Sequence, residues 1–226
     1  MTSTPFLERS VVAAAVRDTV PVAASIAPLA LVIGATAARS GVPVAADMVG
    51  AAFIFAGAAH LAVLTTLGAG ALTALSAAAL INVRLLLYSA SLQPRFGAQP
   101  RWFRWLGPAL VIDQTYLMVT ARDDLDDPVR FRRYWSCAGG LLLGFWVATI
   151  GVGSVLGPLL PTGIPLDAAA VAVLAGMLAP RLRTLRTAAI ALAALLAAVA
   201  VPGGIGLSVG IVAGVVVGAV LDRRAS

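Results

Sequence analysis

Apolar positions along this chain run together in long stretches instead of alternating with polar ones. Eight such stretches can be marked, at residues 20–38, 44–67, 70–91, 106–121, 134–157, 166–180, 186–201 and 204–221. Most of them approach the roughly twenty residues that a helix needs to cross a bilayer, and the alternation of a barrel strand is missing. The pattern therefore predicts an all-α, polytopic helical membrane protein with about eight hydrophobic segments.

We expect a single transmembrane domain at 20–221, between an N-terminal segment at 1–19 and a short tail at 222–226. The stretches at 106–121 and 166–180 are short for a full crossing. They are therefore expected to be tilted, broken or re-entrant.

Composition excludes several classes of protein. Of the 226 residues, 60% are hydrophobic and 12% are charged. Soluble domains are nearer half apolar and a quarter charged. A water-soluble enzyme, a nucleic-acid-binding domain, a coiled coil and a disordered chain are all inconsistent with this balance. The chain has one cysteine, Cys137, so it has no internal disulfide.

The arginines indicate the orientation. All 16 basic residues are arginines, and nearly all lie between apolar stretches, as in cytoplasmic loops. With eight crossings, four arginine groups and both termini fall on the cytoplasmic side. These groups are Arg9 and Arg17; Arg130, Arg132 and Arg133; Arg181, Arg183 and Arg186; and Arg223 and Arg224. The outside loops at 41–43, 158–165 and 202–204 lack arginine. We expect a multi-pass protein of the plasma or inner membrane.

One loop disagrees with this orientation, because Arg95, Arg101 and Arg104 would lie outside. One explanation is that the stretches at 44–67 and 106–121 are re-entrant, which would move the loop inside. The other is that the loop lies at the membrane interface, with aromatic rings at headgroup depth and snorkelling guanidinium groups.

The most charged loop of the chain divides it into two halves. Its acidic run, Asp123–Asp127, is interpreted as a solvated loop that partly neutralises the neighbouring arginines, with a divalent-ion site as the less favoured alternative. Four apolar stretches lie at 20–121 and four at 134–221. This count suggests the two-repeat arrangement of many transporters, although no sequence match links the halves.

Glycine recurs at every fourth position of the last stretch, at Gly206, Gly210, Gly214 and Gly218. Such a stripe lets a second helix approach closely, and packing within the chain is favoured over contact with another subunit. Trp146 is interpreted as a lipid-facing or core ring.

Polar residues inside the third and fourth stretches are the main candidates for function, because a central Arg or Asp costs about 2.5–3.5 kcal/mol. Helical spacing places Asn82 on one face of the third stretch, and Arg84 and Tyr88 on the opposite face. Asp113, followed by Gln114, is the deepest carboxylate. We expect an Arg84–Asp113 ion pair that either locks two helices together or serves coupling, with Asp113 as a candidate proton carrier.

Two other carboxylates lie near the starts of stretches. Asp47 and Asp167 are therefore expected to be helix N-cap residues.

The second stretch contains the only histidine of the chain, His60, after the small-residue run Phe55-Ala56-Gly57. A hydrogen-bonded helix contact is favoured for His60. Solute binding or titration during transport is the alternative. No further ligands point to a metal site.

Several enzyme motifs are absent from the sequence. It contains no phosphate-cradling Gly-Lys-Ser/Thr loop and no Gly-x-Ser-x-Gly or His-rich protease motif. ATP hydrolysis and enzyme activity are therefore not expected, nor is a cofactor. A secondary transporter is favoured because deep polar residues occur on several stretches. A membrane scaffold or an intramembrane enzyme is the alternative.

Three blocks in this order resemble the AzlC family of branched-chain amino-acid exporters. They are Phe55–His60, Asn82–Leu92 and Asp113–Tyr116. Three departures are visible: His60 stands where the family usually has Gln, Leu85 replaces a His, and Asp113-Gln114 replaces an Asp-Glu pair.

The resemblance implies export of leucine, isoleucine, valine and sometimes methionine, driven by an ion gradient, with a small AzlD-type membrane subunit as partner. It also implies an interrupted helix near Phe55–His60 at the substrate site. On this basis the substrate-binding residues are expected to be Phe55, Ala56, Gly57, His60, Asn82 and Tyr88. Arg84, Asp113 and Gln114 are expected to serve as ion-pair or coupling residues.

Overall fold

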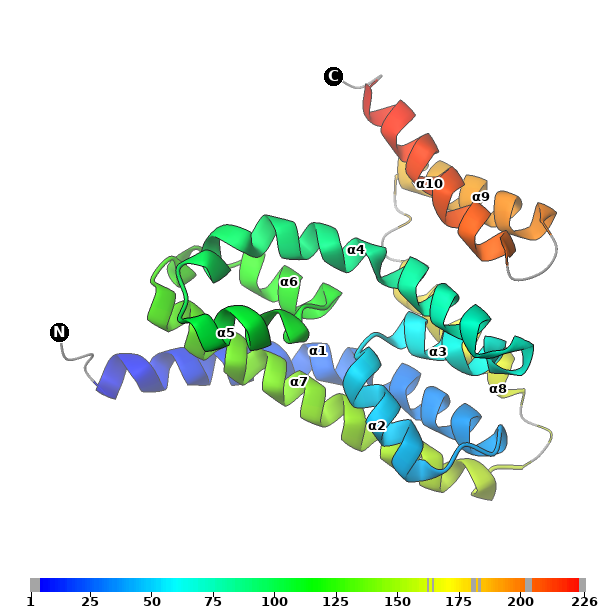
Figure 1. Ribbon diagram of the computed structural model, residues 1–226, viewed down its shortest axis with the longest axis horizontal. Helices are drawn as coiled ribbons and strands as arrows, with labels where there is room; N and C mark the ends of the chain where they lie inside the picture. Colours follow the sequence, from blue (N-terminus) through cyan, green and yellow to red (C-terminus); the bar gives the residue numbers. More distant parts are fainter. Residues whose placement is uncertain are drawn as a thin grey trace.

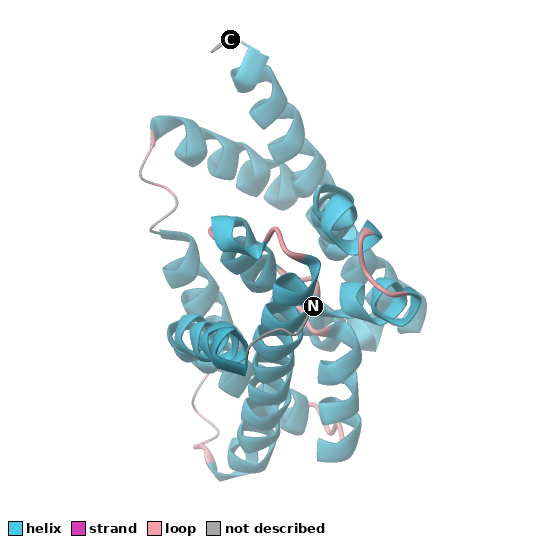
Figure 2. Ribbon diagram, turned by 90° about the vertical axis from the view of Figure 1, so that its left-hand side faces the viewer, coloured by secondary structure: helices cyan, strands magenta, loops and turns pink. Residues whose placement is uncertain are grey.

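The structure is a computed structural model that describes residues 5–161, 163, 165–179, 182, 184–201 and 205–223. All regular structure in these residues is helical, as Figure 2 shows. The all-α prediction is confirmed for this part of the chain. Some residues named above lie outside the described part: residues 1–4, Arg181, Arg183, Pro202–Gly204 and Arg224.

Ten α-helices follow one another within the described residues. They are α1 (Pro5–Arg39), α2 (Val44–Ile54), α3 (Gly57–Thr66), α4 (Ala71–Gly97), α5 (Arg101–Leu106), α6 (Asp113–Thr120), α7 (Pro128–Leu156), α8 (Leu166–Leu178), α9 (Leu185–Ala200) and α10 (Ile205–Arg223). Short 3-10 helices follow α3, α5, α6 and α7; they are η1 (Leu67–Ala69), η2 (Gly107–Leu110), η3 (Asp123–Leu125) and η4 (Gly157–Leu159).

Three helical segments are long and apolar enough to cross a membrane, namely Ser10–Arg39, Ala71–Gly97 and Pro128–Leu159. The other apolar helices in the described residues are shorter. The number of crossings therefore stays a prediction. One boundary differs from expectation, because α1 is continuous from Pro5 rather than beginning near Val20.

The centre of the fold is the pair α1 and α7, which lie side by side (Figure 1). Their backbones touch through glycine: a Cβ on Gly34 would overlap the carbonyl oxygen of Ile150, and one on Gly153 would overlap that of Leu31. Such contact maximises van der Waals packing between helices where lipid provides no hydrophobic driving force. The other helices of the body are arranged around this pair.

The second apolar stretch is interrupted, as the family resemblance implied. Helix α2 ends at Ile54 and α3 begins at Gly57. Between them Phe55 has a left-handed backbone (φ 32°, ψ 41°) and Ala56 is extended (φ −151°). A left-handed conformation costs a residue with a Cβ about 1–2 kcal/mol. Such strain is held by surrounding structure and occurs mainly at functional sites.

The fourth stretch is broken as well. The 3-10 helix η2 ends at Leu110, Ile112 is extended (φ −138°), and α6 begins at Asp113. Thr115 holds this break: its hydroxyl donates to the Leu110 carbonyl (2.7 Å) and accepts from the Ile112 amide (3.0 Å). Of the three alternatives for this short stretch, the structure therefore shows a broken helix.

Helices α9 and α10 form a hairpin that stands apart from the body of the protein (Figure 1). The glycine stripe of α10 packs inside this hairpin. A Cβ on Gly210 would lie 2.7 Å from both the Ala194 carbonyl oxygen and the Ala198 Cβ. One on Gly214 would lie 3.2 Å from the Ala194 Cβ. The favoured interpretation of the stripe, packing within the chain, is confirmed for these two glycines.

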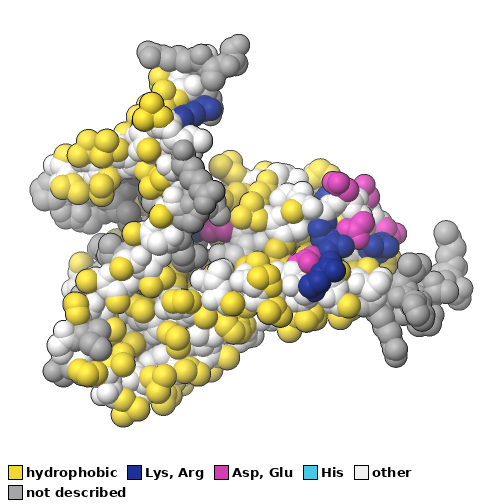
Figure 3. All heavy atoms as spheres, turned by 180° about the vertical axis from the view of Figure 1, so that it is seen from behind, with side chains coloured by type: hydrophobic (Ala, Val, Ile, Leu, Met, Phe, Trp, Pro, Cys, Tyr) yellow, Lys and Arg dark blue, Asp and Glu magenta, His cyan; other side chains and the backbone are white. Residues whose placement is uncertain are grey.

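Charged side chains gather at one end of the molecule, whereas apolar side chains cover much of the face in Figure 3. Arg122 joins three elements there. Its guanidinium bonds both carboxylate oxygens of Asp124 (2.9 Å each) and Asp18 of α1 (2.8 Å), and it lies over the ring of Tyr134 of α7. Arg130 adds a 2.7 Å bond to Asp124. The acidic loop is thus partly neutralised by neighbouring arginines, as expected.

Replacing Gly153 by alanine should destabilise the fold by about 1–3 kcal/mol, because the backbone of α1 must move away from the new methyl group. Gly144→Ala is the matched control on the same helix. Nothing lies within 4 Å of a Cβ at that position, so this variant should be neutral or slightly more stable. Unfolding of both variants in detergent micelles measures the difference. Equal stabilities would contradict the close approach of α1 and α7.

The ion pairs of Asp124 should make stability depend on pH in the acid range. The hydrogen bond from Arg122 is the main cause that lowers the pKa of Asp124 from 3.8 to about 2. The contribution should be complete above about pH 4 and lost as the pH falls towards 2. Because the carboxylate is partly exposed, it should amount to no more than about 1 kcal/mol.

Thermal unfolding of wild-type protein and Asp124→Asn measures this effect. Their difference at neutral pH should disappear near pH 2. Asp123→Asn is the control, because Asp123 forms no ion pair within the described residues. A constant difference across the acid range would show that the ionisation of Asp124 is not responsible.

Candidate functional site

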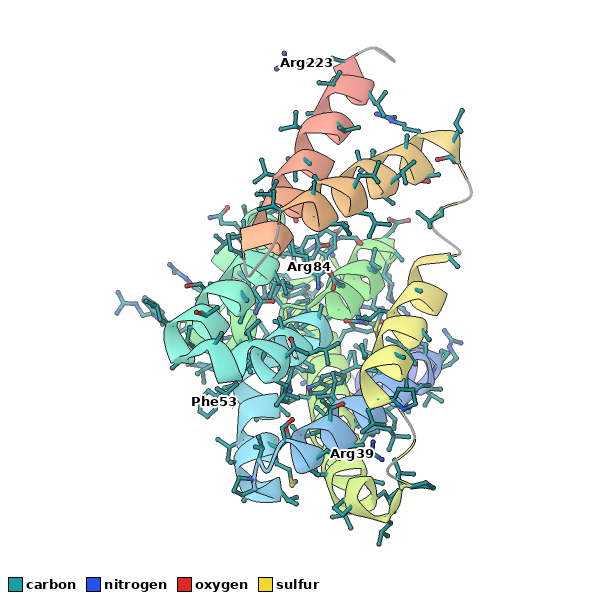
Figure 4. All side chains as sticks on the ribbon, turned by 90° about the vertical axis from the view of Figure 1, so that its right-hand side faces the viewer. Arg39, Phe53, Arg84 and Arg223 are labelled. Carbon is teal, nitrogen blue, oxygen red and sulfur yellow. The ribbon has the colours of Figure 1, made fainter. Side chains whose placement is uncertain are left out.

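A pocket of about 310 Å³ lies where the two helix breaks meet the body of the protein. Figure 4 shows the side chain of Arg84 within this central region, whereas Phe53 points away from it. Six helices and the backbone at both breaks contribute to the wall. The lining residues are Ile26, Leu29, Phe55, Ala56, Gly57, Ala58, Arg84, Leu85, Tyr88, Ile112, Asp113, Gln114, Trp146 and Leu174.

An ion pair forms the polar side of the pocket. The Arg84 Nη2 of α4 lies 2.8 Å from the Asp113 Oδ2 of α6, and the Tyr88 hydroxyl donates to the Asp113 Oδ1 (3.0 Å). The ring of Tyr88 stacks on that of Tyr116, with centroids 4.3 Å apart. The expected Arg84–Asp113 pair is therefore present. The Arg84 side chain is 42% exposed and that of Asp113 28%, so both charges remain open to the pocket.

Two helix N-termini also face the pocket. The first amides of α3 and α6 have no intrahelical acceptor, and the helix dipole places partial positive charge there. Gly57 and Ala58 bring one of these ends to the wall, and Asp113 and Gln114 bring the other. Gly57 has to be small: a Cβ there would lie 2.7 Å from the Leu29 side chain. The breaks thus offer backbone donors that an unbroken helix would lack.

Trp146 lines the pocket, a role that the sequence analysis did not assign to it. The residue is only 3% exposed, and its Nε1 is buried without a hydrogen-bond partner among the described residues. A buried indole N–H usually has an acceptor. Trp146 therefore contributes to the pocket wall and carries a buried indole N–H that no acceptor of the described residues satisfies. From sequence alone, a pocket tryptophan on an apolar helix cannot be told from a core one.

His60 and Asn82 do not line the pocket, although both were expected at the substrate site. Asn82 lies on α4, and its Oδ1 is buried without a partner in the described part of the chain. His60 is 2% exposed, and its Nε2 lies 3.0 Å from the Asp47 Oδ1. The structure therefore places His60 in a contact between α3 and α2, outside the pocket wall. The other expected site residues, Phe55, Ala56, Gly57, Tyr88, Arg84, Asp113 and Gln114, do line the pocket.

The expectation for Asp47 is wrong. Pro43 occupies the N-cap position of α2, and Asp47 lies one turn inside the helix, 2% exposed. It accepts a hydrogen bond from the Ser154 hydroxyl (2.7 Å) in addition to its contact with His60. Asp113 is therefore not the only carboxylate deep in the protein. The expectation for Asp167 is wrong as well, because Pro165 occupies the N-cap position of α8 and Asp167 is the second residue of that helix.

The remaining pocket wall is apolar, with Ile26 and Leu29 from α1, Leu174 from α8, and Phe55 and Leu85. The pocket thus joins an apolar side to one positive side chain, one negative side chain and free backbone donors. This arrangement suits a small molecule with both charges and an aliphatic group. No cluster of three or more metal-ligating side chains occurs in the described residues.

Comparison with known proteins assigns a family. No curated protein and no solved structure matches the chain. The family model described as AzlC protein matches residues 21–160. The match includes both helix breaks and both members of the Arg84–Asp113 pair. Since it covers more than half of the sequence, the chain belongs to the AzlC family, a family of membrane transport proteins associated with branched-chain amino acids.

Proposed function

We propose that this protein is a secondary transporter that exports branched-chain amino acids, leucine, isoleucine and valine, and also methionine. The observation that carries the proposal is the pocket at the two helix breaks. It combines the Arg84–Asp113 pair with an apolar wall. Its volume of about 310 Å³ suits one small ligand.

A free amino acid matches the polar side of this pocket. Its carboxylate would accept hydrogen bonds from the first amides of α3 and from the Trp146 Nε1, and Arg84 would attract it. Its ammonium group would bind Asp113. A zwitterion can enter between Arg84 and Asp113 and leave each charge with an opposite partner. The charged residues therefore need not be left unpaired when substrate binds.

The apolar wall explains the preference for branched aliphatic side chains. Ile26, Leu29 and Leu174 would surround the substrate side chain, which loses its contact with water. A charged side chain would meet no opposite charge on this wall and would pay the cost of desolvation. Branched-chain amino acids and methionine satisfy both sides of the site.

The family and the composition support a proposal for the wider setting of the transporter. The protein would act as a multi-pass protein of the plasma or inner membrane, with both termini cytoplasmic, driven by an ion gradient instead of ATP. A small AzlD-type membrane subunit would complete the transporter. Exposed apolar side chains on α9 and α10, such as Leu195, Val199 and Val215, would contact lipid or that subunit.

Replacing Asp113 by asparagine should lower leucine export at least about tenfold, because the ammonium group of the substrate and Arg84 both lose an ionic partner. The assay uses cells that lack their own branched-chain exporters and express this chain with an AzlD-type partner. After feeding with leucine-containing dipeptides, leucine is followed inside and outside the cells.

Asp126→Asn is the matched control, since that carboxylate is 86% exposed and lies in the charged loop, outside the pocket wall. This variant should export normally. Membrane fractions must contain equal amounts of each variant. If Asp113→Asn exports leucine as well as wild type, or if wild type exports none with its partner present, the proposed role is wrong.

Trp146→Phe should weaken leucine binding by about tenfold, because it removes one hydrogen bond to a charged carboxylate and keeps the ring in place. The measurement is the dissociation constant obtained from the rise in the unfolding temperature of purified protein over a series of leucine concentrations. Trp105→Phe serves as control, since Trp105 is 85% exposed and outside the pocket. Equal affinities in Trp146→Phe and wild type would mean that the indole N–H does not contact substrate.

A further inference from the structure

A second group of polar side chains is buried beside the pocket without lining it. Asp47 of α2 and His60 of α3 are each 2% exposed, and Ser154 of α7 is 1% exposed. The His60 Nε2 lies 3.0 Å from the Asp47 Oδ1, and the Ser154 hydroxyl donates to the Asp47 Oδ2 (2.7 Å). Both carboxylate oxygens of Asp47 are therefore engaged. We call these three residues the Asp47 trio.

One polar atom of the Asp47 trio has no partner. The His60 Nδ1 is buried and forms no hydrogen bond within the described residues. Because Nε2 faces a carboxylate, the proton of the neutral ring is assigned to Nε2, which leaves Nδ1 with a free lone pair. The same atom can therefore accept a proton without breaking any hydrogen bond of the trio.

A proton on this atom would change the net charge of the Asp47 trio. With a neutral imidazole, the trio carries the single negative charge of Asp47 in a buried position, where the hydrogen bonds from His60 and Ser154 stabilise it. A proton on Nδ1 converts the trio into an imidazolium–carboxylate pair without net charge. The Ser154 hydroxyl can donate to Asp47 in both states.

The position of the trio connects it to the pocket. Asp47 and His60 lie on the two helices that flank the Phe55–Ala56 break, so their contact bridges that break. The His60 amide donates a hydrogen bond to the Ala56 carbonyl (2.8 Å), and Ala56 lines the pocket. Ser154 links the trio to α7, the helix that carries Trp146. A change in charge between α2 and α3 would therefore act on the helix ends that form the substrate site.

Other ionisable groups on the neighbouring helices have different partners. On α4, Arg84 and Tyr88 bond Asp113. On α1, Arg39 donates to the carbonyls of Leu160 and Pro161. On α7, the residue that contacts Asp47 is Ser154, whose hydroxyl does not ionise at physiological pH. Among the described residues, Asp47 is therefore the charged group that contacts His60.

We propose that the Asp47 trio is a proton-binding site, separate from the substrate pocket, which couples proton entry to amino-acid export by changing the charge across the break between α2 and α3. The proton comes from a hydronium ion: one of its O–H bonds breaks as the His60 Nδ1–H bond forms, and a water molecule is left. The coupling rests on the proposed export function. The binding of the proton does not.

The first test measures proton binding without transport. The chain has one histidine, so protein that carries a histidine-free tag and ¹⁵N-histidine gives imidazole signals from His60 alone. Between about pH 5 and 9, we expect the Nδ1 signal to report uptake of one proton while Nε2 stays protonated. Asp47→Asn should shift this titration to lower pH, because the protonated ring loses its anionic partner.

Ser154→Ala is a milder second variant in case Asp47→Asn does not fold. Its titration should shift to higher pH, because Asp47 loses a donor that competes with the imidazolium. An Nδ1 signal that does not change between about pH 5 and 9 would overturn the proposal. A titration that is the same in wild type and in both folded variants would also overturn it.

The second test measures coupling in proteoliposomes that contain the chain and its AzlD-type partner. A one-unit pH gradient, coupled one proton to one leucine, should accumulate leucine about tenfold on the acidic side. His60→Gln can still donate to Asp47 but cannot bind the proton. This variant should retain leucine exchange between equal concentrations and lose the accumulation driven by the pH gradient.

The readouts separate the two proposals. If wild type exchanges no leucine, the proposed function fails, and the nitrogen titration alone decides on proton binding. If wild type exchanges leucine and His60→Gln accumulates it as well as wild type, the coupling role of the trio is wrong even when His60 titrates.

Discussion

The direct backbone contact between α1 and α7 is the constraint on which the rest of the structure depends. Gly34 and Gly153 have no side chains, so the two longest helices meet at the distance of their main chains. This contact places Leu29 of α1 and Trp146 of α7 on neighbouring parts of one wall. The broken helices pack against this pair, and the first amides of α3 and α6 therefore keep their positions at the pocket wall.

Much of the fold and one part of the site follow from the sequence. Long apolar stretches give helices because every backbone polar group must be satisfied inside the chain when no water is present. Arg84 and Asp113 can be paired from the sequence, because among the charges of its sign each lies nearest the middle of an apolar stretch, where an isolated charge is costly. The break after Ile54 was indicated by resemblance. Composition gives little sign of it, since Phe55 is not a glycine.

The remaining parts of the site depend on contacts that no local pattern records. Ser154 donates to Asp47, which lies 107 positions earlier in the chain, so the sequence around Asp47 does not indicate this partner. In the sequence, Asp47 resembles a helix cap because it lies near the start of an apolar stretch. In the structure, Pro43 is the cap and Asp47 lies one turn further on. Trp146 has the same local surroundings in the sequence as a core aromatic residue, and only the pocket that it forms with residues of other helices shows that it borders open space.

The left-handed backbone of Phe55 has a mechanical consequence for the transporter. Its ring is only 5% exposed, so the residue that opens the helix is also fixed in the core. A break at an exposed glycine could move along the helix by one residue at little cost. Here, such a slide would pull an aromatic ring out of its packing site. The opening therefore stays in one register, and the helix end at Gly57 keeps its position.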